Sequence, residues 1–193
     1  FFWLAGHYAK NENAGRMREI LDALRARPEA SEHEIEISYY LAESFRIEQN
    51  VEQAFRHYDD VIAADEVFKA NAFFGKGLCF GTLEQYEKSI EAFGFAVKHA
   101  GDDHALAIRS RMETANAYYV MENYAEAAKA YFAVAILYDD AESVPEALME
   151  AGNAFQRAGS TSEAGQAYRE LTERFPDHPL SSKAKTQLKK LPE

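Results

Sequence analysis

The stretch MENYAEAAKAYFAV, residues 121–134, decides the fold of this chain. After Asn123, small or apolar residues follow at Ala127, Tyr131 and Val134. Steps of four, four and three residues place these side chains on one face of an α-helix. Asn is also a preferred residue immediately before a helix, where its side chain accepts a backbone N–H group. The stretch therefore predicts an amphipathic helix that begins just after Asn123.

The same pattern occurs five times along the 193 residues. The other copies read NAGRMREILDAL, NVEQAFRHYDDV, QYEKSIEAFGFA and STSEAGQAYREL. The first marker of each copy is a small or apolar residue, and its positions advance by 37, 35, 38 and 37 residues: Met17, Ala54, Ser89, Ala127 and Ala164. The second marker is Leu or an aromatic residue: Leu21, Tyr58, Phe93, Tyr131 and Tyr168. A recurrence at this spacing is typical of repeat proteins.

Each copy follows another helical segment, which ends in a small residue and an aromatic residue three places later. These pairs are Ala5/Tyr8, Ala42/Phe45, Gly77/Phe80, Ala115/Tyr118 and Gly152/Phe155. A small residue lets two helices approach closely, so each unit is predicted to be a helical hairpin. The expected caps before the second helices are Asn13, Asn50, Gln85, Asn123 and Ser160. Capping boxes are expected at Ser31/Glu34, Ser143/Glu146 and Ser160/Glu163.

The repeat resembles the tetratricopeptide repeat (TPR), a helix–turn–helix unit of about 34 residues. EQNVEQAFRHYDDV and MENYAEAAKAYFAV carry the likeness, and Pro176 in ERFPDHP stands where that family places its terminal Pro. The resemblance implies an all-α fold, a right-handed α-solenoid of about five hairpins with a C-terminal capping helix. Lys76 and Arg111 depart from it, because the family usually packs apolar residues at those positions. The expected ranges, within one solenoid domain, are 1–28, 31–66, 69–101, 104–140 and 143–176, with the capping helix at 179–191.

The long period and the ending FPDHPLSSKAKTQL also resemble bacterial cell-envelope members of the family. Examples are the periplasmic Tol-Pal coordination protein and the lipoprotein of the outer-membrane assembly machinery. This resemblance slightly favours a periplasmic or cell-envelope location over a cytoplasmic one.

The first residues, FFWLAGHY, correspond to the back half of a first helix. We therefore expect the chain to be a fragment of a longer protein, with its first repeat truncated. The alternative is a self-association patch formed by Phe1, Phe2 and Trp3, since exposed apolar clusters often mark interfaces.

Composition and motifs argue against several functions. A net charge of −11 disfavours nucleic-acid binding, which depends on Lys and Arg, and no apolar run approaches the length of a membrane span. Cys79 is the single cysteine and is expected to be a buried, inert thiol. The stretch HAGDDH (99–104) and the pair Asp139–Asp140 are interpreted as loop and turn residues. No enzyme activity, metal or cofactor is predicted.

The family resemblance also indicates a groove. Family members line their concave face with positions two, five, nine and twelve of each unit. A chaperone-type carboxylate clamp is not expected, because Lys is absent at position five and Arg109 is the only cation at position two. Aromatic, Met and Asn side chains instead suit an apolar peptide or an amphipathic helix. The predicted partner-binding residues are Tyr39, Tyr40, Glu43, Phe74, Leu78, Arg109, Met112, Asn116, Tyr119, Met149 and Asn153.

The sequence thus predicts a non-catalytic scaffold, a chaperone-like adaptor that binds a protein or peptide partner in this groove. Two alternatives stay open. The array is a structural segment of a larger assembly that docks through its aromatic N-terminal and lysine-rich C-terminal ends, or it is the accessory domain of a larger enzyme.

Overall fold

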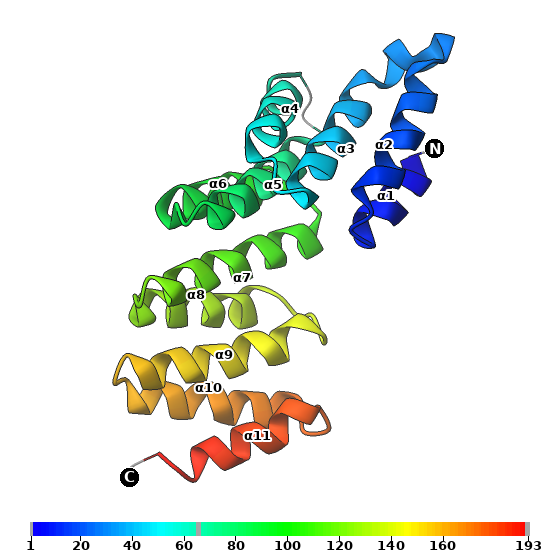
Figure 1. Cartoon of the computed structure of the whole chain (residues 1–193). Coiled ribbons are helices and arrows are strands. Elements are labelled where there is room, and N and C mark those ends of the chain that lie inside the picture. Colours follow the sequence, from blue (N-terminus) through cyan, green and yellow to red (C-terminus); the bar gives the residue numbers. More distant parts are fainter. Residues whose placement is uncertain (1, 65–66, 192–193) are drawn as a thin grey trace. The chain divides into compact units, whose positions relative to one another are not determined.

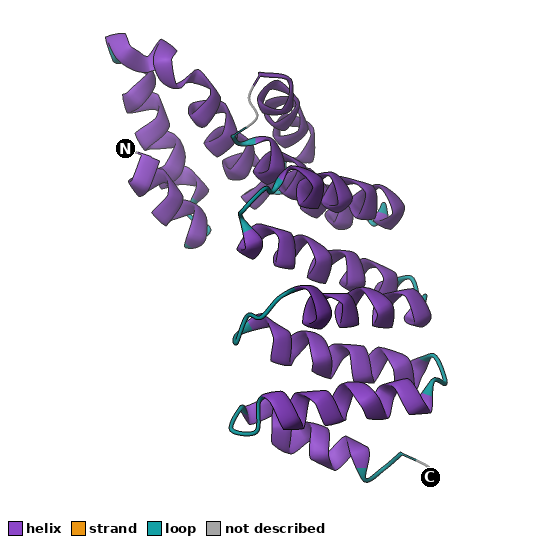
Figure 2. Cartoon of the chain, turned by 180° about the vertical axis from the view of Figure 1, so that it is seen from behind, coloured by secondary structure: helices purple, strands orange, loops and turns teal. Residues whose placement is uncertain are grey.

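A computed structural model describes residues 2–64 and 67–191 of the chain. Every regular element in these ranges is a helix, and Figure 2 shows them in purple joined by short loops. The helices are α1 (Phe2–Lys10), α2 (Ala14–Arg25), the short 3₁₀ helix η1 (Pro28–His33), α3 (Glu34–Ile47), α4 (Val51–Ala64), α5 (Lys69–Thr82), α6 (Tyr86–His99), α7 (His104–Val120), α8 (Tyr124–Leu137), α9 (Ser143–Arg157), α10 (Thr161–Arg174) and α11 (Pro179–Leu188). The predicted all-α fold of helical hairpins is confirmed.

The helices form two compact units, residues 1–101 and 102–193. In the first unit, α1 to α6 pack in chain order, and each helix contacts the next (Figure 1). In the second unit, α7 to α10 do the same, and α11 packs on both α9 and α10. Ala184 of α11 is buried against the core of the last hairpin, as expected of a capping helix. That the chain is a single solenoid domain stays a prediction.

A Schellman motif ends the first helix of all five hairpins. The turn residue before each second helix has a positive φ: Glu12, Gln49, Glu84, Glu122 and Gly159. The next residue donates its N–H group back to the carbonyl of the repeat aromatic, as Asn123 does to Tyr118 over 2.9 Å. The aromatic residue of the sequence pattern is therefore also the residue whose carbonyl closes the turn.

The helix caps are only partly as predicted. Asn13 and Asn50 do cap α2 and α4, through their side-chain oxygens. The capping box at Ser31 is wrong, because η1 occupies that segment and α3 begins without a side-chain cap. Asp140, rather than Ser143, supplies the cap before α9, where it accepts the N–H group of Ser143 at 2.6 Å. No side chain caps α6, α8 or α10 at Gln85, Asn123 or Ser160.

Glycine at the left-handed turn residues is expected to stabilise the protein. Glu84 has φ +57°, a conformation that costs a residue with a Cβ atom about 1 kcal/mol. Glu84→Gly should therefore raise the free energy of unfolding by about 0.5–1 kcal/mol, measured by urea denaturation. The matched control is Glu91→Gly in the interior of α6, where the same replacement should lower it by about 1 kcal/mol. Equal losses from both variants would contradict this role of the turn.

Small residues of the first helices lie directly beneath the large side chains of the second helices. A Cβ atom on Gly77 would lie 2.4 Å from the Phe93 ring, and one on Gly152 would lie 2.3 Å from the Tyr168 ring. Gly75, unexplained by the sequence pattern, has the same role between neighbours. Its missing Cβ leaves room for Tyr58 of the preceding hairpin, 2.3 Å from where that atom would stand.

The two basic residues that departed from the family pattern do occupy half-buried positions. Lys76 is 18 % exposed, forms a 2.5 Å ion pair with Asp59 and lies over the Phe55 ring. Arg111 donates to the Tyr138 hydroxyl over 3.3 Å. Their long apolar stems fill the space that an apolar residue would fill, while their charged ends reach partners.

The aromatic N-terminus is divided between core and surface. Phe1 lies outside the described residues. Phe2 packs on the rings of His33 and Tyr40, whereas Trp3 is 78 % exposed and stacks on His7. Self-association through the aromatic N-terminal residues stays a prediction.

Candidate functional site

A buried tyrosine hydroxyl in three of the second helices donates to the residue fifteen places earlier. Tyr58 donates to Glu43, Tyr131 to Asn116, and Tyr168 to Asn153 at 2.8 Å. All three tyrosine rings are buried, so each hydroxyl needs an acceptor within the protein. We call these the tyrosine–acceptor pairs.

The acceptors of these pairs are three of the residues predicted to line the groove. In this structure Glu43, Asn116 and Asn153 each satisfy a hydroxyl of their own hairpin. The third hairpin has Leu78 and Phe93 at the same separation, so the acceptor and the hydroxyl are absent together. The signal that sequence reasoning missed is this paired change at a separation of fifteen residues.

Burial of the tyrosines raises their pKa. Burial raises the pKa of Tyr168 to about 12, and the nearby Glu150 carboxylate acts in the same direction. Burial, followed by the charge of Glu43, raises the pKa of Tyr58 well above its ordinary value. Glu43 also accepts from Arg46 at 2.7 Å, so it joins two donors in the second hairpin.

Several of the predicted aromatic and Met groove residues are packing residues. Phe74 and Met149 are each only 7 % exposed, and Phe74 lies 5.5 Å from the Phe93 ring centre. Tyr39 and Tyr40 contact each other edge-to-face, and Tyr39 also packs on Phe68. These side chains pack between helices. The surface available to a partner is therefore smaller than the full predicted set of groove residues.

Part of the predicted set in the second unit stays accessible. Arg109 and Asn116 are exposed, while Met112 and Tyr119 are half-buried against the core of their hairpin. The Tyr119 ring contacts Tyr124 edge-to-face at 5.1 Å. These four residues lie on α7, and Asn153 on α9 is half-buried as well, so the accessible part of the predicted groove in this unit includes residues of both helices.

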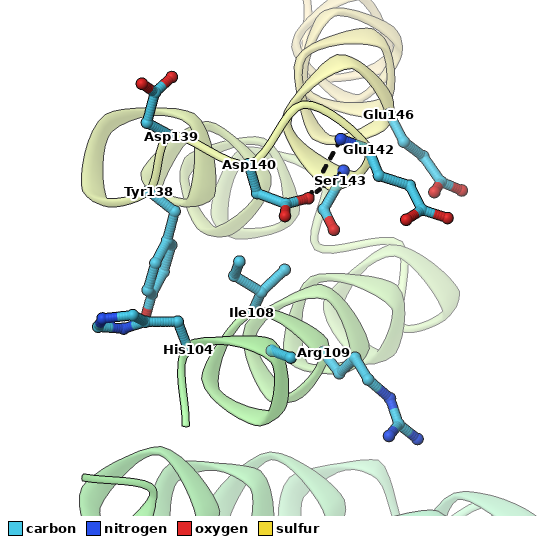
Figure 3. Close-up of a pocket in the computed structure, with 10 residues that line it drawn as sticks. His104, Ile108, Arg109, Tyr138, Asp139, Asp140, Glu142, Ser143 and Glu146 are labelled. Atoms are coloured by element: carbon cyan, nitrogen blue, oxygen red, sulfur yellow. Dashed lines mark hydrogen bonds between the residues drawn. The ribbon is translucent and has the colours of Figure 1, made fainter. Parts of the chain in front are cut away.

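A cavity of about 580 Å³ lies in the second unit, where α7 and α9 begin (Figure 3). Ile108 lies at its centre in the view, with Tyr138 and Arg109 extending on opposite sides. Its lining comes from α7, the connection between α8 and α9, and the first turn of α9: His104, Ala105, Ile108, Arg109, Tyr138, Asp139, Asp140, Glu142, Ser143 and Glu146. Of the predicted site residues, only Arg109 belongs to this cavity.

Carboxylates dominate the polar lining of the cavity. Asp140 accepts backbone N–H groups from Ser143 and Glu142, and these hydrogen bonds lower the pKa of its carboxyl. Glu142 and Glu146 stand on the α9 side, whereas Asp139 points away from the other lining residues (Figure 3). The sequence indicates turn residues at Asp139–Asp140, and in the structure these two acidic residues also line the cavity.

Among the described residues, no group of three or more His, Cys, Asp or Glu side chains could hold a metal ion. Within the same ranges, no helix has the length and apolarity needed to cross a membrane. Cys79 is fully buried, and burial raises the pKa of its thiol to about 12.

The stacked hairpins within each unit define the class of the protein as an α-helical repeat array. The sequence profile of the tetratricopeptide repeat family matches residues 146–178, which span most of α9, all of α10 and the following turn. The last hairpin therefore matches the tetratricopeptide repeat in sequence, and the other hairpins share its helical-hairpin fold. No curated protein matches the chain in sequence.

Solved structures share the fold at low sequence identity. The nearly identical TPR-like repeats of a Podosopora anserina protein superpose with a TM-score of 0.66 at 18 % identity, covering 96 % of this chain and 94 % of that one. The apo form of RapI superposes with a TM-score of 0.64 at 14 % identity, covering 97 % of this chain and 68 % of that one. These comparisons support the TPR-like fold. They give no support to the cell-envelope subgroup, and the compartment stays a prediction.

Proposed function

We propose that this protein is a protein-interaction scaffold, and that the cavity between α7 and α9 receives a side chain of the partner. The observation that carries the proposal is the open cavity of about 580 Å³ at the start of two neighbouring first helices. It lies beside the accessible residues of α7, so that a bound segment can contact both.

The charges of the cavity specify the partner further. Asp140, Glu142 and Glu146 face a lining that also offers the apolar side chain of Ile108 and the ring of Tyr138. An aromatic face beside carboxylates suits a Lys or Arg side chain, whose stem packs on the ring while its charge meets the acids. The net charge of −11 favours the approach of a cationic partner. We therefore propose a partner segment that carries a basic residue next to an apolar one.

Peptide selection on the whole chain tests this function. A random peptide library displayed on phage is panned against the protein, and enriched peptides are measured by fluorescence anisotropy. Enriched peptides should carry Lys or Arg beside an apolar residue. The double variant Glu142→Gln/Glu146→Gln should weaken their binding about tenfold, since each exposed ion pair contributes up to about 1 kcal/mol.

The matched control is Glu126→Gln/Glu163→Gln, which removes the same charge from the first turns of α8 and α10. It should leave the affinity within about twofold, as expected for charges separated from the site by screening solvent. Enrichment of peptides without basic residues would contradict the proposal. So would equal binding by the cavity variant and the native chain.

A further inference from the structure

A second surface with different chemistry lies in the first unit, between α5 and α6. A groove of about 200 Å³ is lined by three phenylalanines, two lysines, a glutamate and an alanine: Phe73, Lys76, Phe80, Lys88, Glu91, Ala92 and Phe95. We call it the phenylalanine–lysine groove. It shares no residue with the cavity of the second unit or with the predicted groove positions.

The apolar walls of this groove are stacked rings that are partly open to solvent. Phe73 and Phe95 stack with their ring centres 5.0 Å apart, and Phe73 also stacks on His99. Phe95 is nevertheless 38 % exposed, which is unusual for a phenylalanine on a helix of a packed hairpin. The stack thus presents an apolar face that a partner side chain can cover.

The two lysines differ in what they contribute. The Lys76 ammonium already pairs with Asp59 and lies 5.6 Å from the Phe55 ring centre, so its charge is engaged within the protein. Lys88 is exposed, donates to the neutral amide oxygen of Gln85 at 2.9 Å and lies 5.7 Å from the Phe80 ring centre. Lys88 therefore offers its positive charge to an incoming group beside the apolar wall.

The size and charge of the groove indicate which kind of ligand fits it. Small-molecule pockets usually measure about 300–1,000 Å³, so a groove of this size fits a single large side chain better than a metabolite. Glu91 disfavours a second negative charge in the same place. We propose that the phenylalanine–lysine groove binds a partner protein through an aromatic side chain next to one carboxylate, the apolar ring meeting Phe73 and Phe95 and the carboxylate meeting Lys88.

A minimal probe tests this proposal. N-acetyl-Asp-Phe-amide is titrated into the isotope-labelled chain and followed by ¹H–¹⁵N NMR. We expect saturable shifts confined to α5 and α6, with a dissociation constant on the order of 1 mM for so small a ligand. N-acetyl-Lys-Phe-amide and N-acetyl-Asp-Ala-amide should bind several-fold more weakly, because each lacks one of the two contacts.

Variants on α6 make the test specific. Lys88→Glu should weaken the Asp-Phe probe about fivefold and favour the Lys-Phe probe, whereas Lys98→Glu makes the same charge change outside the groove and should alter neither. Both lysines are exposed, so helicity measured by circular dichroism should be unchanged. Three results would overturn the proposal: no saturable shift, equal binding of the two charged probes, or groove shifts that depend on protein concentration alone, which would indicate a second copy as the occupant.

Discussion

Replacing Gly152 by Ala is expected to lower the free energy of unfolding by about 2–3 kcal/mol. The direction is opposite to helix propensity, since Ala is a better helix former than Gly by about 1 kcal/mol. The reason is the Tyr168 ring, whose nearest atom lies 2.3 Å from where the new Cβ would stand. Tyr168 has no room to yield, because it is fully buried and its hydroxyl oxygen lies 2.8 Å from Asn153 Oδ1 and 2.7 Å from Gln156 Oε1, the two acceptors available to its single proton.

Urea denaturation followed by far-ultraviolet circular dichroism measures this loss. Gly94→Ala is the matched control, since Gly94 lies inside α6 and a Cβ atom added there would have no neighbour within 4 Å. This variant should gain about 0.5–1 kcal/mol. The two Gly→Ala variants, both within helices, should thus change the free energy of unfolding in opposite directions. A gain in stability for both variants would show that the contact between Gly152 and Tyr168 is not tight.

Replacing Glu43 by Leu is expected to cost about 2–3 kcal/mol of folding stability. Glu43 accepts from both Tyr58 and Arg46, so its removal leaves a fully buried hydroxyl and a largely covered guanidinium without this acceptor. Tyr58→Phe alone should cost about 1 kcal/mol, because the ion pair between Glu43 and Arg46 remains.

The double variant Glu43→Leu/Tyr58→Phe recreates the Leu78/Phe93 combination of the third hairpin. It should cost about 1 kcal/mol less than the sum of the two single changes, because the two groups no longer depend on each other. Glu52→Leu, an exposed carboxylate on α4, serves as the control and should change stability by less than about 0.5 kcal/mol. Additive losses in a urea denaturation series would disprove the coupling.

The fold could be predicted from the sequence because its signal is repeated. Five copies of one spacing located the helices on both sides of each turn, and α4, α8 and α10 begin directly after the expected cap residues. The start of α3 was missed because Pro28 begins a 3₁₀ turn there, and Ser31 lies inside that turn. A local preference for capping was overridden by the backbone that leads into it.

The candidate site was less predictable, for a physical reason. Family positions indicate which direction a side chain leaves its helix, but they do not tell whether a neighbouring helix covers it. Phe74 and Met149 are covered by neighbouring helices, whereas Arg109 is exposed. Tyr138 and Glu142 line the cavity and lie in the connection between α8 and α9. The repeat pattern covers the helices and not this connection, so it does not predict these two residues.

The tyrosine–acceptor pairs also bear on how such an array can be rearranged. Both members of each pair lie within one hairpin, so a hairpin moved to another place in the chain takes its hydroxyl and its acceptor with it. Gly75 is different, because its missing side chain accommodates Tyr58 of the hairpin before it. The third hairpin is therefore fitted to the second, because Gly75 leaves room for the Tyr58 ring. The tyrosine–acceptor pairs impose no such requirement on the neighbouring hairpin, since each hydroxyl finds its acceptor within its own hairpin. Duplication and shuffling of complete units, followed by paired substitution within them, is the evolutionary route that this arrangement leaves open.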